Sequence, residues 1–216
     1  MQVTGSKKKI SVRVGLTAFC YKADGCAQSQ WLGADRVFSR KQLQDADVEI
    51  SVFSHKFALI PENFFREEEA GKMLSSAVVM AEDEKVEYCE VPDYGAVAVY
   101  SCSGIEKSPL MPQVADLPVR PELLCILEAM HRVEDYNKII ASVAEGRLYL
   151  AIAQGNTLLL ATSYEIADFT TAEYHIFYAL KKFQMNPELS TVYLRTPLSA
   201  SEEMSLYNYF KSVELI

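Results

Sequence analysis

The sequence predicts an α/β protein with α+β character, built from two lobes that each contain a mixed sheet with flanking helices. Residues 136–213 read as three strands, a helix, a strand and a helix in unbroken order. The first half also begins with hairpin patterns and then alternates helix with strand. A segment with four prolines, 104–121, lies between the two halves and is the best candidate for a linker. We therefore expect lobes at 1–120 and 121–216.

Three strands open the second half, because short runs rich in β-branched residues, Leu and Tyr are separated by tight turns containing Gly. The expected strands are Tyr136–Ala144, Arg147–Ala153 and Thr157–Tyr164. Apolar residues from Thr170 to Phe183 then recur at helical spacing, and Asn186-Pro187 ends that helix. Such a crossover helix predicts that the next strand, Thr191–Arg195, is parallel to its neighbour.

The last element is predicted as a helix that starts with a capping box. Ser199 precedes Glu202 by three residues, and apolar residues at Leu206, Phe210 and Val213 continue the helical spacing. The second half is therefore expected to have the order β-β-β-α-β-α.

The first half is less regular, and its elements are predicted from shorter patterns. Strand patterns cover 9–21, 31–38, 48–53, 57–60, 85–91 and 96–102, helical patterns cover 39–45 and 62–75, and turns are expected at Asp24-Gly25 and 92–95. A helix that begins at Pro121 has apolar residues at spacings of three and four, and it is expected to bridge the two halves.

Composition limits the function classes. Lys and Arg total 21 against 29 Asp and Glu, a net charge of −8, which argues against a nucleic-acid-binding protein. The five cysteines are scattered without a C-x-x-C pair, as expected for reduced core residues. No run of apolar residues is long enough for a membrane span, so the expected location is the cytoplasm.

Two stretches resemble a known family. The run Phe57–Phe65 is similar to the strand-Pro-helix segment of a bacterial family described as domain of unknown function 3822, and so is Leu158–Phe183, with Asp168-Phe169, Tyr174 and Leu180. The resemblance implies an actin-like ATPase fold of two ribonuclease-H-like lobes. It implies no established activity and supplies no catalytic residues.

An actin-like nucleotide site needs a hairpin in each lobe, with backbone N–H groups and an Asp that hold the metal-bound phosphates. The first hairpin offers Arg13-Val14-Gly15-Leu16-Thr17, which has no Asp, and the second offers Ala153-Gln154-Gly155-Asn156-Thr157, which has no carboxylate to hold Mg²⁺. Weak candidates for nucleotide binding are therefore Gly155, Asn156, Thr157 and Asp93. The three histidines have no metal-ligand spacing, so no metal site is expected.

One helix face is a candidate interaction surface. Tyr174, Phe177 and Tyr178, with Lys181 beside them, lie opposite the core-facing residues of the helix 170–183. This face is expected either to pack against the other lobe or the last helix, or to contact a protein partner or a second copy of the chain.

Two function classes follow from the sequence. The first is a non-catalytic interaction or scaffold protein on a degenerate actin-like ATPase fold, without a cofactor. The alternative is a nucleotide-binding ATPase or kinase-like enzyme with a non-standard site, which would use ATP and Mg²⁺. The missing hairpin carboxylates favour the first class.

Overall fold

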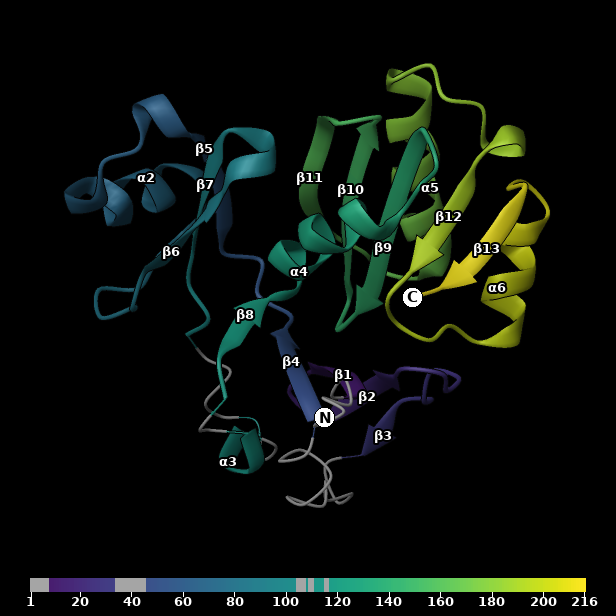
Figure 1. Cartoon of the computed structure of the whole chain (residues 1–216), viewed down its shortest axis with the longest axis horizontal. Helices are drawn as coiled ribbons and strands as arrows, with labels where there is room; N and C mark the ends of the chain where they lie inside the picture. The colour runs from purple at the N-terminus through teal and green to yellow at the C-terminus, as the bar shows by residue number, and fades with distance from the viewer. Residues whose placement is uncertain (1–7, 34–45, 104–107, 109–110, 115–116) are drawn as a thin grey trace, which may run out of the picture.

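The computed structural model describes residues 8–33, 46–103, 108, 111–114 and 117–216 (Figure 1). The described strands form three sheets. The first sheet has the order β3 (Leu32–Gly33), β2 (Ala18–Ala23), β1 (Lys8–Val14), β4 (Ala46–Val52) and β8 (Val119–Pro121). The second has the order β11 (Thr157–Glu165), β10 (Arg147–Gln154), β9 (Asn137–Ala144), β12 (Thr191–Leu194) and β13 (Ser212–Leu215). The third has the order β5 (Phe57–Pro61), β7 (Ala96–Tyr100) and β6 (Glu87–Val91).

Short helices connect these strands. The described α-helices are α2 (Ala70–Ala77), α3 (Met111–Val114), α4 (Glu122–Ala129), α5 (Phe169–Lys182) and α6 (Ala200–Tyr207). Single turns of 3-10 helix cover Glu62–Phe64, Glu67–Glu69, Pro92–Tyr94, Met130–Arg132 and Pro187–Leu189. The predicted helical segment 39–45 and the end of the predicted strand 31–38 lie outside the described residues.

The two five-stranded sheets have the same topology. In the first, β1 pairs antiparallel with β2 and parallel with β4, and β4 pairs parallel with β8. In the second, β9 pairs antiparallel with β10 and parallel with β12, and β12 pairs parallel with β13. The predicted parallel pairing after the crossover helix is therefore confirmed. The matching topologies make the chain a structural duplication of one mixed-sheet unit.

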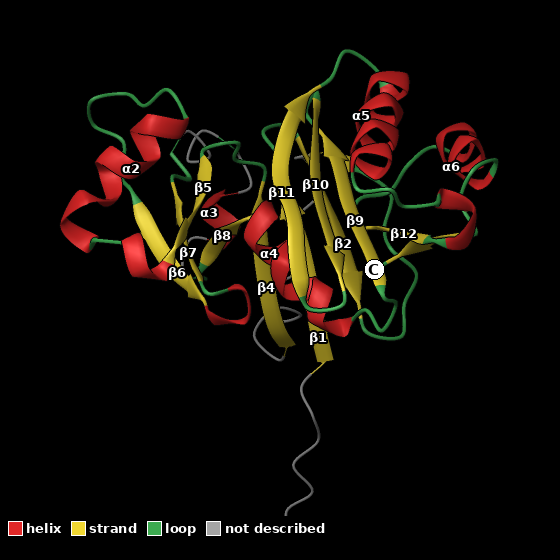
Figure 2. Cartoon of the chain, turned by 90° about the horizontal axis from the view of Figure 1, so that it is seen from above, coloured by secondary structure: helices red, strands yellow, loops and turns green. Residues whose placement is uncertain are grey.

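Helices cover both faces of the second sheet (Figure 2). On one face, α4 packs against side chains such as Ile140 and Tyr149, and on the other, α5 and α6 pack against alternating neighbours such as Ile139 and Leu148. This alternation follows from the two-residue period of a strand. Almost every residue of α4 is buried, because the helix also contacts β4 and β8 of the first sheet. The two lobes thus share the core around α4.

The regular elements of the second half match their predictions closely. The helix α5 begins at an N-cap, Asp168, whose Oδ1 accepts a hydrogen bond of 2.8 Å from the backbone N–H of Thr171. The capping box of α6 is present, with Ser199 and Glu202 as its members. Both caps satisfy helix N–H groups that would otherwise have no partner.

Four element predictions were wrong in part. The alternating run 9–21 is two strands, because the chain turns back at Gly15-Leu16-Thr17. The predicted helix 62–75 breaks at Phe65 and Arg66, which have extended backbones, so regular helix covers only 70–77. The last helix ends at Tyr207, and Val213 lies in the parallel strand β13. The end of the expected linker forms β8, which pairs with β4.

The shared core around α4 predicts a large cost for a cavity there. Leu127 is fully buried, whereas Leu189 is 74% exposed. Leu127→Ala should lower the free energy of unfolding by about 3 kcal/mol, and Leu189→Ala should change it by less than about 0.5 kcal/mol. Denaturant unfolding of both variants measures this difference, and equal effects would contradict the position of α4 in the core.

Candidate functional site

The turns of two hairpins, one from each lobe, face each other. The first turn, Gly15-Leu16-Thr17, joins β1 to β2, and the second, Glu145-Gly146, joins β9 to β10. Glu145 and Gly146 both have positive φ angles, 53° and 70°. The sequence pattern pointed to Gly155-Asn156-Thr157 as the second hairpin, but that turn joins β10 to β11 at the other end of β10. The turn opposite the first hairpin is therefore Glu145-Gly146.

The Glu145 carboxylate occupies the first turn. Its Oε1 accepts a hydrogen bond from the backbone N–H of Leu16. A Cβ atom placed on Gly15 would lie 2.6 Å from the same oxygen, so a larger residue at position 15 would displace the Glu145 carboxylate from the turn. In addition, the hydroxyl of Ser108 donates a 2.9 Å hydrogen bond to the carbonyl oxygen of Gly15. A side-chain anion of the second lobe thus binds the backbone of the first lobe's turn.

A cluster of buried charged side chains lies beside α4 and joins the lobes. Arg195, which follows β12, donates from Nε to Glu122 Oε1 at 2.8 Å and from Nη2 to Glu49 Oε1 at 2.9 Å. Glu122 is the first residue of α4 and also accepts a 2.6 Å hydrogen bond from Ser142. Arg13 of β1 lies 4.0 Å from Glu122. We call Arg13, Glu49, Glu122 and Arg195 the interlobe charge cluster.

Charges in the cluster shift one another's pKa values. Burial tends to raise the pKa of Glu49, but Arg195, Lys9 and Arg120 outweigh it and lower the pKa to about 2. The pKa of Glu122 is also lowered despite complete burial, because Arg195 and Arg13 stabilise its carboxylate. Burial and the nearby Arg195 lower the pKa of Arg13. Both carboxylates are therefore ionised at neutral pH, and Arg13 is less well compensated than Arg195.

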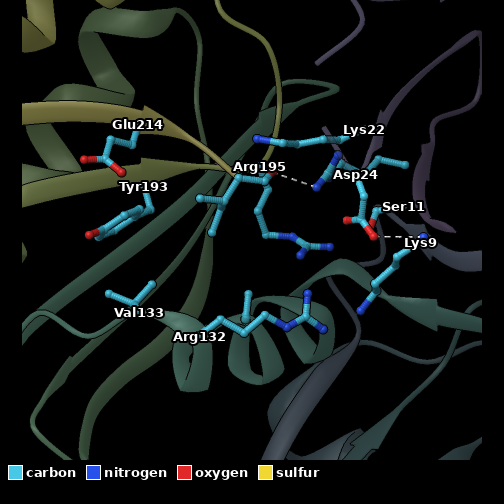
Figure 3. Close-up of a pocket in the computed structure, with 12 residues that line it drawn as sticks. Lys9, Ser11, Lys22, Asp24, Arg132, Val133, Tyr193, Arg195 and Glu214 are labelled. Carbon is cyan, nitrogen blue, oxygen red and sulfur yellow. Dashed lines mark hydrogen bonds between the residues drawn. The ribbon is translucent and has the colours of Figure 1, made fainter. Parts of the chain in front are cut away.

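A cavity of about 420 Å³ opens beside this cluster, between β1 and β2 of the first lobe and β12 and β13 of the second (Figure 3). Residues of α4 and the following 3-10 turn close one side. The lining side chains are Lys9, Ser11, Arg13, Lys22, Asp24, Ala129, Arg132, Val133, Tyr193, Arg195, Glu214 and Ile216. The cavity is rich in cationic groups, although the chain as a whole is acidic. It is thus the candidate site for an anionic ligand.

Three of the four weak nucleotide candidates lie around a different and smaller cavity. Asp93, Gly155 and Asn156 line a space of about 160 Å³ with Tyr94, His131 and Lys138, whereas Thr157 does not line it. The His131 Nε2 lies 3.0 Å from Asp93 Oδ2, and the N–H of Gly155 donates to the Tyr136 carbonyl at 2.8 Å. This space is smaller than the roughly 300 Å³ of an ordinary ligand pocket. The Gly155 N–H is also already used.

The predicted interaction surface is exposed in part. Tyr174 and Tyr178 are 61% and 56% exposed, and their rings stack at 6.0 Å. Phe177 is half-buried against Tyr209 and Phe210, at ring distances of 5.0 Å and 5.7 Å, whereas Lys181 is exposed. Phe177 thus packs on two rings that follow α6, and the rings of Tyr174 and Tyr178 are exposed in the single chain. We call Tyr174, Phe177, Tyr178 and Tyr209 the aromatic face.

The five cysteines differ in their burial and in the state of their thiols. Burial raises the pKa of Cys20 to about 11 and also raises that of Cys125, so both thiols are protonated at neutral pH. Cys89 and Cys102 are half-buried and Cys26 is exposed, so the expected core position holds fully for two of the five. No group of three or more His, Cys, Asp or Glu side chains in the described ranges has the geometry of a metal site.

Comparison with known proteins places the chain in a family. The model of the family described as "Protein of unknown function (DUF3822)" matches residues 28–213. The chain belongs to this family. This match confirms the resemblance inferred from Phe57–Phe65 and Leu158–Phe183. No curated protein matches the sequence.

Solved structures show the fold. A Bacteroides thetaiotaomicron protein with an actin-like ATPase fold and unknown function is 19% identical, with a TM-score of 0.66 over 98% of this chain and 91% of that one. The cytoplasmic domain of EpsL from the Vibrio cholerae type II secretion system is 12% identical, with a TM-score of 0.48 over 88% of this chain and 83% of that one. PilM, in the PilM–PilN type IV pilus biogenesis complex, is 11% identical, with a TM-score of 0.47 over 96% and 88%. The DUF3822 chain has an actin-like ATPase fold.

The interlobe charge cluster predicts a specific loss of stability in acid. Glu49 has a folded-state pKa of about 2 against an ordinary 4.5, so its contribution is complete above about pH 4.5 and is lost as the pH falls toward 2. Glu49→Gln should cost about 3 kcal/mol at neutral pH, and the difference from the native protein should shrink toward pH 2. Urea unfolding across this pH range measures it.

The control for this experiment is Glu68→Gln, which removes an exposed carboxylate. Its effect should stay below about 0.5 kcal/mol at every pH. A Glu49→Gln difference that stays constant from pH 7 to pH 2 would contradict the assignment.

Proposed function

We propose that this DUF3822 chain is a non-catalytic interaction protein that pairs with a second copy of itself through the aromatic face. The observation that carries the proposal is the exposure of Tyr174 and Tyr178 one turn apart on α5, continued through Phe177 to the 52% exposed Tyr209. Aromatic residues are enriched in the cores of protein interfaces. Three large exposed rings on one surface support a contact with protein.

Charge on α5 supports a second copy as the partner. Glu173 lies in the first half of the helix, and Lys181 and Lys182 lie in its last turn. Two α5 helices packed antiparallel around a two-fold axis near Phe177 would place Glu173 of each copy near Lys181 of the other, because the two residues lie four positions either side of Phe177. The same arrangement opposes the two helix dipoles favourably and makes the contact self-complementary.

The interaction proposal is preferred to the alternative, a nucleotide-dependent enzyme. In the actin-like fold the backbone of the first hairpin is expected to hold phosphate oxygens, but here Glu145 accepts the Leu16 N–H. The one carboxylate in these two turns, Glu145, already accepts this hydrogen bond, and neither turn contains an aspartate. The cavity at Gly155 and Asn156 is too small for a nucleotide. These observations support a protein that does not hydrolyse ATP.

No helix in the described ranges combines the length and apolar character needed to span a bilayer.

The aromatic face predicts the effect of single substitutions on oligomeric state. We expect a dimer in sedimentation equilibrium or light scattering, and Tyr178→Glu should convert it to a monomer because it buries a charge in the contact. The matched control is Tyr136→Glu, at a 70% exposed ring outside the aromatic face, which should leave the dimer intact.

Charge exchange tests the antiparallel arrangement itself. Lys181→Glu should weaken the dimer, and the double variant Glu173→Lys, Lys181→Glu should restore it, because the opposite charges again face each other. A monomeric native protein, or dimerisation unaffected by Tyr178→Glu, would contradict the proposal.

Because Glu145 binds the Leu16 N–H of the first hairpin turn, we expect no magnesium-dependent nucleotide binding. A ligand present at a hundred times its dissociation constant stabilises a protein by ~2.7 kcal/mol, which a thermal shift detects. The shift with ATP and Mg²⁺ should be no larger than with ATP and EDTA, and phosphate release should equal the buffer rate. The variant Glu145→Ala frees the Leu16 N–H, so it is the variant in which nucleotide binding at the first hairpin turn would be easiest to detect. A larger shift with Mg²⁺, together with turnover by the native protein, would contradict the non-catalytic assignment.

A further inference from the structure

The 420 Å³ interlobe cavity is separate from the hairpin turns and from the aromatic face. None of the residues 15–17, 145–146 or 174–178 lines it. Its volume lies within the range of roughly 300–1,000 Å³ that small-molecule sites occupy. Both lobes contribute to its walls, together with the 3-10 turn that follows α4 (Figure 3). The cavity is therefore a second surface with the dimensions of a ligand site.

The lining of the cavity has an excess of positive charge. Its cations are Lys9, Arg13, Lys22, Arg132 and Arg195, and its acids are Asp24 and Glu214. Behind the lining, Glu49 pairs with Arg195 and lies 3.6 Å from Lys9. Asp24 and Glu214 are exposed, and Asp24 already accepts a 3.0 Å hydrogen bond from the backbone N–H of Lys9. The side chains that line the cavity thus include more cations than carboxylates.

Arg13 is the buried group with the least compensation. It is 1% exposed, and its Nη2 donates to the backbone oxygen of Ile216 at 3.0 Å. Its Nε and Nη1 are buried without a hydrogen-bond partner among the described residues. A buried guanidinium normally has all of its donors paired, because an unpaired buried charge is costly. Arg13 therefore places a buried positive charge beneath the cavity, where it would attract an anion bound above it.

Lys22 and Arg132 extend the same pattern. The Lys22 ammonium donates to the neutral backbone oxygen of Leu215, and both burial and the nearby Arg13 lower its pKa. Arg132 is exposed at the rim and has no ion pair or hydrogen bond in the described ranges. Figure 3 shows the ends of Lys9, Arg132 and Arg195 directed toward one shared space. Cations from both lobes and from the turn after α4 therefore converge.

We propose that this interlobe cavity binds a small molecule that carries a phosphoryl group. The group lies between Lys9 and Arg132 at the rim and Arg13 beneath them, and the organic part of the molecule packs on Ala129, Val133 and Tyr193. A phosphoryl group fits because its several oxygens accept hydrogen bonds from cations that approach from different directions. Bound in this position, the ligand would contact both lobes and stabilise their present arrangement.

The test uses pyrophosphate as the probe, measured by isothermal titration calorimetry on the full chain at constant ionic strength set with NaCl. We expect one saturable site with a dissociation constant below about 1 mM, in the range of ordinary small-ligand affinities. Arg132→Gln and Lys9→Gln should each weaken binding at least about tenfold. Arg66→Gln, an exposed arginine on the third-sheet side of the chain, is the matched control and should bind as the native protein does.

Two further arms decide the ligand class and exclude unfolding as a cause. Circular dichroism should show Arg132→Gln and Lys9→Gln folded, since both side chains are at least partly exposed. Binding of citrate that equals or exceeds that of pyrophosphate would overturn the phosphoryl assignment in favour of a carboxylate ligand. Heat that does not saturate, or that is unchanged in both variants, would overturn the site altogether.

Discussion

The arrangement of the two lobes depends on the ion pairs that Arg195 makes with Glu49 and Glu122. These three side chains are almost completely buried, and they come from β4, α4 and the end of β12. Removing charges from water is costly, and the cost is offset only when geometry and hydrogen bonding are good, as they are here at 2.8 Å and 2.9 Å. Apolar packing around α4 would allow the lobes to slide, whereas paired charges require one register. The cluster therefore defines how the lobes meet.

Other interlobe features follow from this register. The same approach of the lobes brings the Glu145 turn to the Leu16 N–H and encloses the cationic cavity beside Arg13. In an ATPase of this fold the space between lobes must accept and release a nucleotide. Here one part of that space is held by internal ion pairs and another by a side-chain carboxylate. We propose that the actin-like fold is used here as a fixed platform for contacts, with a separate anion site between the lobes.

The sequence predicted the parts of the fold that depend on local pattern. Strands β9 to β11 and helix α5 have clear periods, and the turns between these strands contain Gly146 and Gly155 at positive φ. Strand β8 was missed because it is short and pairs with β4, which is distant in the sequence. Strand β13 was missed because it is short and Val213 continues the helical spacing of α6. The Glu62–Glu69 region carried helix-forming acids, but the extended backbone at Phe65 and Arg66 divides it. Local propensity could not reveal these tertiary constraints.

The candidate site was less predictable than the fold. The sequence pattern indicated Asp93, Gly155 and Asn156 as turn residues that could bind phosphate. They do lie together, but they line a small polar cavity. The residues of the interlobe charge cluster are single charges inside apolar runs, separated by up to 182 positions, and no spacing links them. The one available signal was their position: Arg13, Glu49 and Arg195 each lie in or directly after a strand pattern, where a charge needs a buried partner. That signal shows that a partner is needed without identifying it.

The most direct test of the account is a double-mutant cycle on Glu49 and Arg195, which come from different lobes. The free energies of unfolding of Glu49→Gln, Arg195→Met and the double variant should be non-additive, with a coupling energy of about 2 kcal/mol and a single cooperative transition in each protein. Additive effects within about 0.5 kcal/mol would mean that the two residues act independently, and would contradict the claim that their ion pair holds the lobes together.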